Sequence, residues 1–283
     1  RAIAIGINPS GYTGVSYSTS AGSWAKVGAD PGNTYGSLQV ETGKWYHYAV
    51  VRDGSNGYQF INGVKAETFT FSGTLTDWNG GMHFSHWHDG YERTFIGEIF
   101  DFRMTKGVAR YTQNYTIPTS RLIAKHGSAS GTGTTLPTDA FFANTVFLQS
   151  SNTTPANTTI NNNESYTDDS GNQTISRHTG TIYTSSFSPY IPESDWSIRY
   201  DGSDDYFYYQ SSSVIPPPVA WLDGASDDGT FECNIWLNGA QASPSQDYTW
   251  AAMFNLGSTY MNFGIDNSGN IIGSRVEDIC KIC

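Results

Sequence analysis

The chain has 283 residues and a formal net charge of −11, and charged and aromatic side chains each make up 14% of it. A disordered chain would be rich in charge and poor in aromatic residues, and a helical bundle would be rich in Ala, Leu, Glu and Lys, so the composition excludes both classes. The length suggests two domains or one large β domain, and no stretch reaches the roughly 18 apolar residues that a membrane helix needs, so we expect no membrane insertion.

Short apolar segments separated by glycine-rich turns fill residues 1–122 and predict successive β-strands. The candidates are residues 2–8, 14–18, 45–53, 58–62, 66–71, 81–85 and 94–104. Strands at this spacing favour an antiparallel sandwich or barrel. In the last of them Ile96, Phe100, Phe102 and Met104 share one parity, which predicts that these four side chains face the core.

A polar tract at residues 123–139 predicts a linker, and predicted strands resume after it. The candidates are residues 140–149, 173–184, 196–200, 206–210, 230–237, 248–255 and 260–266. The proline run at 216–218 belongs to an edge or a crossover, because proline cannot lie inside a central strand. The expected organisation is therefore two β-rich portions, residues 1–122 and 140–283, joined by the linker.

The charge differs between the two ends of the chain. Residues 1–125 carry a net charge of +2 and residues 126–283 a net charge of −13. An acidic surface repels phosphate backbones, so we expect no nucleic-acid partner. The three cysteines, Cys233, Cys280 and Cys283, are too few for a disulfide framework, and the last two have no second pair of ligands for zinc nearby in sequence.

The first and last strands of the chain resemble one another. The segment AIAIGINPSGYTGVSYS, which begins at Ala2, parallels YMNFGIDNSGNIIGSRV, which begins at Tyr260, with Gly6 matching Gly264. Both segments predict a strand, a polar turn and a second strand. The match indicates the same point in successive copies of one repeat, and the alternative is a chance match between two glycine-containing hairpins.

The most specific string in the chain is DFRMTKGVARYTQNYTIPT, residues 101–119. It resembles the closing signature of the concanavalin A-like, laminin-G-like domains found in bacteriophage virion proteins, in which a final strand precedes a basic turn and an aromatic exit. Upstream, KWYHYAVVRDG at residues 44–54 is similar to one of the paired strands of that family. The signature positions in this portion are Trp45, Asp101, Arg103, Lys106, Arg110 and Tyr111.

The second portion resembles the opening of the same domain. SIRYDGSDDYFYY at 197–209 is similar to a strand–turn–strand of the family, and TFECNIWLN at 230–238 is similar to its first long core strand, with Trp236 as the buried tryptophan. Closing strands thus precede opening strands, the reverse of the family order.

This reversed order leaves three arrangements: a window from tandem sandwiches, which we prefer, one circularly permuted sandwich, or a subunit whose halves complete its neighbours. The resemblance implies an all-β fold, an antiparallel jelly-roll β-sandwich that is tandem or circularly permuted. Trp45 and Trp236 in one core would favour the permuted form.

Glucanases that share this sandwich carry two acidic residues at even spacing on one strand. The nearest pair here, Glu98 and Asp101, is three positions apart, so strand alternation directs the two side chains to opposite faces. Retaining glycoside hydrolysis requires carboxylates about 5 Å apart. We therefore expect no enzymatic activity. For Arg110 we expect a structural bond to carbonyls or to a carboxylate such as that of Asp101.

The densest cluster of aromatic and titratable side chains is HFSHWHDGY, residues 83–91. Aromatic rings stack on the C–H faces of sugars, and His and Asp supply hydrogen bonds, so the cluster predicts a glycan-binding loop. A metal site on His86 and His88, or a loop packed against a neighbouring subunit, are the alternatives. The glycan-binding candidates are His83, His86, Trp87, His88, Asp89 and Tyr91.

Acidic turns in the second portion offer oxygen ligands of the kind that calcium prefers. The metal candidates are Asp168, Asp201, Asp204 and Asp205. Tight turns need the same residue types for backbone reasons alone. We therefore expect no required cofactor, with calcium as the one metal that the sequence suggests.

The resemblance implies a non-enzymatic structural and adhesion protein of a bacteriophage virion, as a tail fibre, spike or capsid decoration that binds surface glycans. The implied partners are other virion subunits or further copies of the chain, and host surface polysaccharide. The implied location is the virion, an extracellular particle. The alternative is a bacterial or eukaryotic carbohydrate-binding adhesin, secreted or at the cell surface.

Overall fold

A computed structural model gives the structure of part of the chain. The described residues are 3–7, 10–20, 23–27, 39–71, 73, 82–84, 95–119, 122, 139–149, 159–160, 177–179, 182–185, 187, 189–190, 197–201, 206–209, 227–239, 251–256, 262–265 and 271–274. Across these residues, no helix has the length and apolar character needed to cross a membrane.

Two large sheets form the body of the molecule. The first has seven strands, in the order β11 (Arg177–Thr179), β14 (Tyr206–Tyr209), β7 (Met82–Phe84), β16 (Ala251–Leu256), β1 (Ile3–Ile7), β2 (Thr13–Ser20) and β3 (Ser23–Val27). Aromatic and β-branched residues are frequent in these segments, as expected for strands that bury one face.

The second sheet has nine strands. Along its main path lie β10 (Thr159–Ile160), β12 (Ile182–Ser185), β13 (Ser197–Asp201), β8 (Ile96–Lys106), β15 (Gly229–Leu237), β4 (Trp45–Asp53), β5 (Asn56–Ile61) and β6 (Val64–Thr70). The ninth strand, β9 (Thr145–Gln149), follows a short 3-10 turn at Phe142–Asn144 and pairs with β8.

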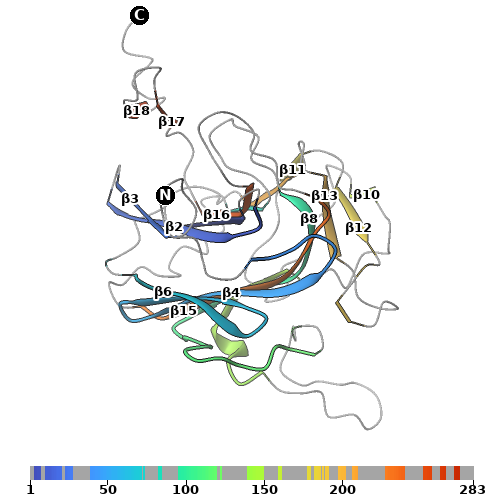
Figure 1. Ribbon diagram of the computed structural model, residues 1–283, viewed down its shortest axis with the longest axis horizontal. Coiled ribbons are helices and arrows are strands. Elements are labelled where there is room, and N and C mark those ends of the chain that lie inside the picture. Colours follow the sequence, from blue (N-terminus) through green and yellow to red (C-terminus); the bar gives the residue numbers. More distant parts are fainter. Residues whose placement is uncertain are drawn as a thin grey trace, which may run out of the picture.

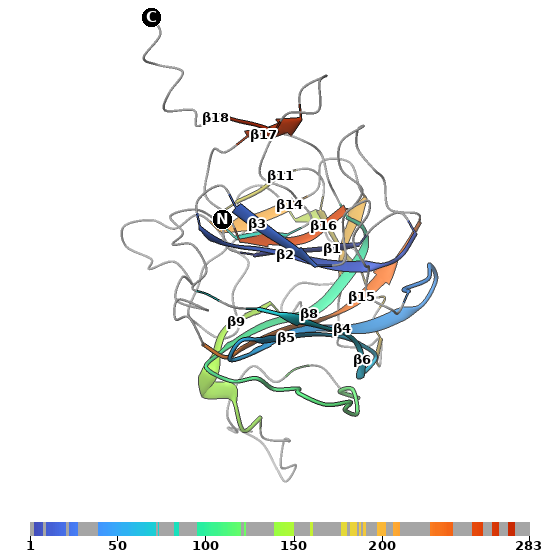
Figure 2. The ribbon, with the colours of Figure 1, turned by 60° about the vertical axis from the view of Figure 1, so that its left-hand side comes forward.

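The two sheets lie one above the other, as Figures 1 and 2 show. The ladders between the named strands are antiparallel. This architecture confirms the predicted all-β antiparallel sandwich. A third, two-stranded sheet contains β17 (Asn262–Ile265) and β18 (Ile271–Ser274).

Strands from the two portions of the chain share both large sheets. In the nine-stranded sheet β15 lies between β4 and β8, and its Trp236 is the register partner of Trp45. In the seven-stranded sheet β16 lies between β1 and β7. The described strands of the two large sheets therefore form one sandwich. This is the arrangement expected of a circularly permuted single domain. The linker is described only at its last residue, Asp139, and its boundaries stay a prediction.

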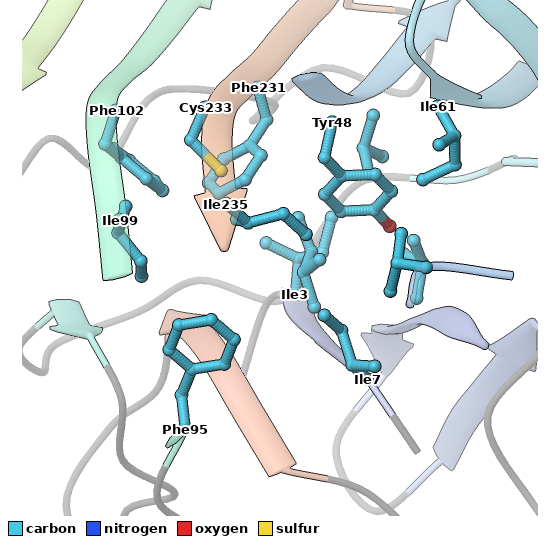
Figure 3. Packing of buried hydrophobic residues seen from close by; sticks show 14 of the residues in the cluster. Ile3, Ile7, Tyr48, Ile61, Phe95, Ile99, Phe102, Phe231, Cys233 and Ile235 are labelled. Atoms are coloured by element: carbon cyan, nitrogen blue, oxygen red, sulfur yellow. The ribbon is translucent and has the colours of Figure 1, made fainter. Parts of the chain in front are cut away.

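The main hydrophobic core fills the space between the two sheets (Figure 3). Ile3 and Ile7 of the seven-stranded sheet are fully buried together with Tyr48 and Ile235 of the nine-stranded sheet. The Phe231 side chain also belongs to this core. This burial of apolar surface is the main force that holds the sheets together.

A small polar cluster joins the two sheets inside the core. The Thr13 hydroxyl of β2 and the Tyr48 hydroxyl of β4 both donate to Oε1 of Gln59 on β5, at 3.2 and 2.8 Å. Buried hydroxyl groups are costly unless they are hydrogen-bonded. The cluster therefore fixes the position of β2 over β4 and β5 as well as satisfying these groups.

A β-bulge in β8 changes which residues face the core. Phe100 pairs with Asn234 but Arg103 pairs with Glu232, so two residues of β8 oppose Cys233 alone, and Asp101 adopts a φ of 51°. A bulge of this kind reverses the alternation of side chains along a strand.

The prediction that four residues of β8 share one core-facing side is therefore wrong in part. Phe102 and Met104 lie in the core between the sheets, as predicted. Phe100, which lies before the bulge, is buried on the opposite side of its sheet, where its ring is 5.5 Å from that of Tyr190. Ile96 is only half-buried and lies outside the core.

Candidate functional site

The face of the nine-stranded sheet turned away from the core carries a buried ionic network around Glu232 of β15. This carboxylate is fully buried and accepts hydrogen bonds at Oε1 from Nε and Nη2 of Arg103, at 2.8 and 2.6 Å. The Tyr111 hydroxyl donates to Oε2 at 2.7 Å, and His47 Nε2 lies 3.3 Å from the same oxygen. A carboxylate from the second portion is thus enclosed by partners from the first.

The network strongly favours the ionised form of Glu232. Burial by itself would raise the pKa of this carboxyl, but the Arg103 charge, with His47 and Arg110, holds the pKa far below its ordinary value. Burial raises the pKa of the Tyr111 hydroxyl, and the neighbouring Glu232 charge raises it further, so the phenol keeps its proton and donates it to the carboxylate. The network is therefore a fixed charge cluster that stabilises the fold.

The basic turn after β8 is held by Asp139, the last residue of the predicted linker. Arg110 donates from Nη1 and Nη2 to the two Asp139 oxygens at 3.0 and 2.9 Å, and Arg103 Nη1 donates to the same carboxylate at 2.7 Å. The expected structural bond of Arg110 to a carbonyl or a carboxylate is therefore present, with Asp139 as the carboxylate, and Asp101 accepts the backbone N–H of Leu122. Asp139 thereby fixes the start of β9 to the end of β8.

Lys106 marks the end of β8 through its backbone. Its carbonyl accepts a hydrogen bond from the Asn144 side-chain amide at 3.1 Å. The next residue, Gly107, has a φ of 74° and donates its N–H to the Asp228 carbonyl at 2.8 Å. A positive φ favours glycine, so the basic turn needs Gly107 for backbone reasons.

Residues 107–119 continue from this turn across the outer face of the sheet, as the green segment in Figure 2 shows. The rings of Tyr111 and Tyr115 stack at 3.6 Å and pack against Phe60. The Tyr115 hydroxyl lies 3.0 Å from His47 Nδ1. The backbone N–H of Tyr115 donates to the Gly63 carbonyl at 2.9 Å. The segment therefore covers part of the outer face and shields the ionic network from water.

The lowered pKa of the Asp139 carboxyl should make the free energy of unfolding depend on pH. Burial opposes its ionisation, but the Arg110 hydrogen bonds, the Phe141 N–H and the Arg103 charge lower its pKa below 3.8. A carboxyl whose folded pKa is lowered adds stability above its unfolded pKa and loses that stability as pH falls through the folded pKa. Below about pH 4 the wild-type free energy of unfolding should therefore fall more steeply than that of Asp139→Asn.

Urea titrations at several pH values between about 2 and 6 measure this difference. Glu41→Gln is the control, because Glu41 forms an exposed pair with Lys44, and exposed pairs contribute little. A parallel pH dependence for wild type and Asp139→Asn would contradict the role of Asp139 as the ionised partner of Arg110 and Arg103.

A second feature of the outer face is an aromatic surface formed by Trp45, Phe187 and Trp236. The Trp45 and Trp236 ring centroids are 5.9 Å apart, and Phe187 lies 5.4 Å from Trp45 and 4.4 Å from Trp236. Phe187 is 39% exposed and both tryptophans are half-buried. The expectation of Trp236 as a buried core residue was therefore wrong, since β15 directs this ring outward.

A hydrogen bond holds one ring of this outer aromatic surface in place. Trp236 Nε1 donates to the Asn238 side-chain oxygen at 3.0 Å. The Asn238 side chain is exposed. Gly43 donates its N–H to the Leu237 carbonyl at 3.1 Å, so the exposed Lys44, the next residue, lies near Trp236 in the fold. Ordered rings beside exposed polar groups are a surface on which a sugar ring can stack and form hydrogen bonds.

The predicted glycan-binding loop begins on the other sheet. His83 lies in β7, where its Cα register partners are Tyr208 of β14 and Asn255 of β16. The remaining candidates lie outside the described residues: His86, Trp87, His88, Asp89 and Tyr91. The loop therefore stays a prediction, and it follows a strand of the sheet opposite the outer aromatic surface.

The predicted metal site is described at one residue only. Asp201 is exposed at the end of β13, and Asp168, Asp204 and Asp205 lie outside the described residues. Within the part of the chain that the structure describes, no group of three or more His, Cys, Asp or Glu residues is arranged to hold a metal ion. The carboxylate of Asp228, another acidic residue of the second portion, accepts the Gly54 N–H at 2.8 Å. Calcium binding stays a prediction.

Comparison with known families agrees with this architecture. Residues 2–110 match a family model described as the concanavalin A-like lectin/glucanases superfamily. The matched region runs from β1 to the basic turn and so includes Trp45, Arg103 and Arg110. No curated protein and no solved structure gives a significant match to the chain.

Proposed function

We propose that this chain is a non-enzymatic carbohydrate-binding and adhesion module. The observation that supports the proposal most is the match of residues 2–110 to a superfamily of lectins and glucanases. Because one fold can support many functions, the choice between binding and hydrolysis depends on particular side chains.

The acidic residues of β8 favour binding over hydrolysis. Glu98 is 5% exposed and hydrogen-bonds the Ser197 hydroxyl, and Asp101 is 2% exposed and accepts the Leu122 N–H. A glycosidase needs two carboxylates that flank a bound sugar. Carboxylates that are buried and hydrogen-bonded within the protein in this way have a structural role, which favours a binding module over a glycosidase.

Two surfaces are candidates for the glycan contact. The loop at residues 83–91 has the aromatic and hydrogen-bonding residue types that sugars require. The outer aromatic surface has ordered and partly exposed rings. Since the two are separate in sequence, single substitutions can distinguish their contributions.

A glycan array followed by titration calorimetry tests the proposal. Wild type should bind at least one glycan, and either Trp87→Ala or Trp236→Ala should weaken that binding by about tenfold, which corresponds to about 1.4 kcal/mol. Phe141→Ala is the matched control, because Phe141 is an exposed ring that belongs to neither surface. Absence of glycan binding by wild type, or unchanged affinity in both tryptophan variants, would contradict the proposal.

For its biological setting we propose a bacteriophage virion, as a tail fibre, spike or capsid decoration that contacts other virion subunits or copies of itself and host polysaccharide. The resemblance of residues 101–119 to the closing signature of such domains supports this setting. The alternative is a secreted or cell-surface adhesin. Antibodies against the chain should label purified phage particles, and labelling confined to a cell surface or culture medium would favour the adhesin.

A further inference from the structure

The hairpins β1–β2 and β17–β18 have the same strand register. The internal match relates them by a shift of 258 residues, as between Gly6 and Gly264. The Cα pairs of the second hairpin are Asn262–Ser274, Phe263–Gly273, Gly264–Ile272 and Ile265–Ile271. With the same shift they correspond to the first-hairpin pairs Ala4–Ser16, Ile5–Val15, Gly6–Gly14 and Ile7–Thr13.

This agreement bears on how each hairpin can pack. A slip of one residue would direct every side chain of a strand to the opposite face. Because the sequence match and the register agree at every pair, the positions of β17 and β18 alternate between faces as those of β1 and β2 do. β17 therefore has the pattern needed for the place of β1, since Phe263 and Ile265 correspond to the buried Ile5 and Ile7. β18 matches β2 in register but carries Gly273 at the position of Val15.

The two hairpins occupy different environments. β1 pairs with β16 as well as β2, with Ile5 opposite Phe254, and Ile5 is fully buried in the core. β17 and β18 pair only with each other among the described strands, and Figures 1 and 2 show them apart from both large sheets. An isolated two-stranded hairpin is marginally stable in water. Pairing with a larger sheet would therefore stabilise the second hairpin.

In the sequence, the second hairpin directly follows β16, the strand that pairs with β1. Residues 257–261 connect β16 directly to β17. Connections of this length commonly join antiparallel neighbours. A short connection also gives β17 a high effective concentration beside β16.

We propose that β17–β18 is a second occupant of the place beside β16 and exchanges there with β1–β2 of the same chain. The place beside β16 is the same in the two states, and the states differ in which hairpin pairs with β16. In the second state β17 pairs with β16 and residues 3–20 are released from the core. The proposal concerns the assembly of the sandwich and is independent of glycan binding.

Cysteine pairs in the full-length chain test the exchange, with Cys280 and Cys283 replaced by Ser in every variant. Opposed Cα positions in antiparallel strands lie about 4.5–5.5 Å apart, within the range that a disulfide spans. Ile5→Cys with Phe254→Cys reports the first state. Phe254→Cys with Phe263→Cys reports the second state, because Phe263 corresponds to Ile5. Phe254→Cys with Gly264→Cys is the slipped control.

Under mild oxidation and at low protein concentration, the 254–263 pair should form a disulfide within one chain and the 254–264 pair should not. Adding Ile5→Ser, which weakens the packing of β1, should raise the 254–263 yield by at least about threefold. This variant leaves β16 and β17 unchanged, so the readout survives a loss of β1 packing. No 254–263 disulfide in either background, or a disulfide that forms only between chains, would overturn the proposal.

Discussion

Replacement of Arg103 by Met is expected to lower the free energy of unfolding by about 3–5 kcal/mol. Arg103 is 4% exposed and makes two hydrogen bonds to Glu232 and one to Asp139. Met keeps much of the apolar volume but removes the charge, and the Glu232 carboxylate is then buried without its main counter-charge. Urea unfolding followed by tryptophan fluorescence measures the change.

Arg199→Met is the matched control for this variant. Arg199 lies on β13 beside β8, as the register partner of Glu98, but its side chain is exposed. Substitutions at exposed positions usually change stability by less than about 0.5 kcal/mol. Equal effects of the two substitutions would contradict a buried ionic network.

Replacement of Phe231 by Ala is expected to cost about 3–5 kcal/mol of stability. Phe231 is 1% exposed, and its ring lies 4.3 Å from that of Phe102 in an edge-on contact. Removal of the ring leaves a cavity between the sheets that the surrounding strands can fill only in part. The same urea titration measures the loss.

Phe141→Ala provides the control for the core substitution. The same atoms are removed from a ring that is 41% exposed and stacks on the Arg110 guanidinium at 5.3 Å. A loss of less than about 1 kcal/mol is expected there. A loss at Phe231 no larger than this would mean that β15 does not contribute to the core.

The strands that carry strong local signals could be predicted from the sequence. The predicted strand at 45–53 coincides with β4, and the prediction at 230–237 differs from β15 by one residue. Apolar alternation and glycine-rich turns act over a few residues, so they are visible without the fold. The face of β8 could not be predicted in full, because the bulge at Asp101 depends on how that strand pairs with β15.

The ionic network was missed because its members are far apart in sequence. Glu232, Arg103 and His47 come from three strands, and Asp139 lies in a polar tract that has the composition of a linker. One local signal was available: Glu232 is the single charge within the largely apolar string TFECNIWL. A charge at the centre of a buried strand requires a partner, although its identity depends on strand order.

The central claim is that the described strands β1–β16, which come from both portions of the chain, form one sandwich, with β15 between β4 and β8. The most direct test is a double-mutant cycle between Arg103→Met and Glu232→Leu, in which the free energy of unfolding is measured for wild type, both single variants and the double variant. Direct contact predicts a coupling energy of about 2–3 kcal/mol, with the double variant losing much less than the sum of the single losses. Additivity within about 0.5 kcal/mol would contradict the pairing of the two portions.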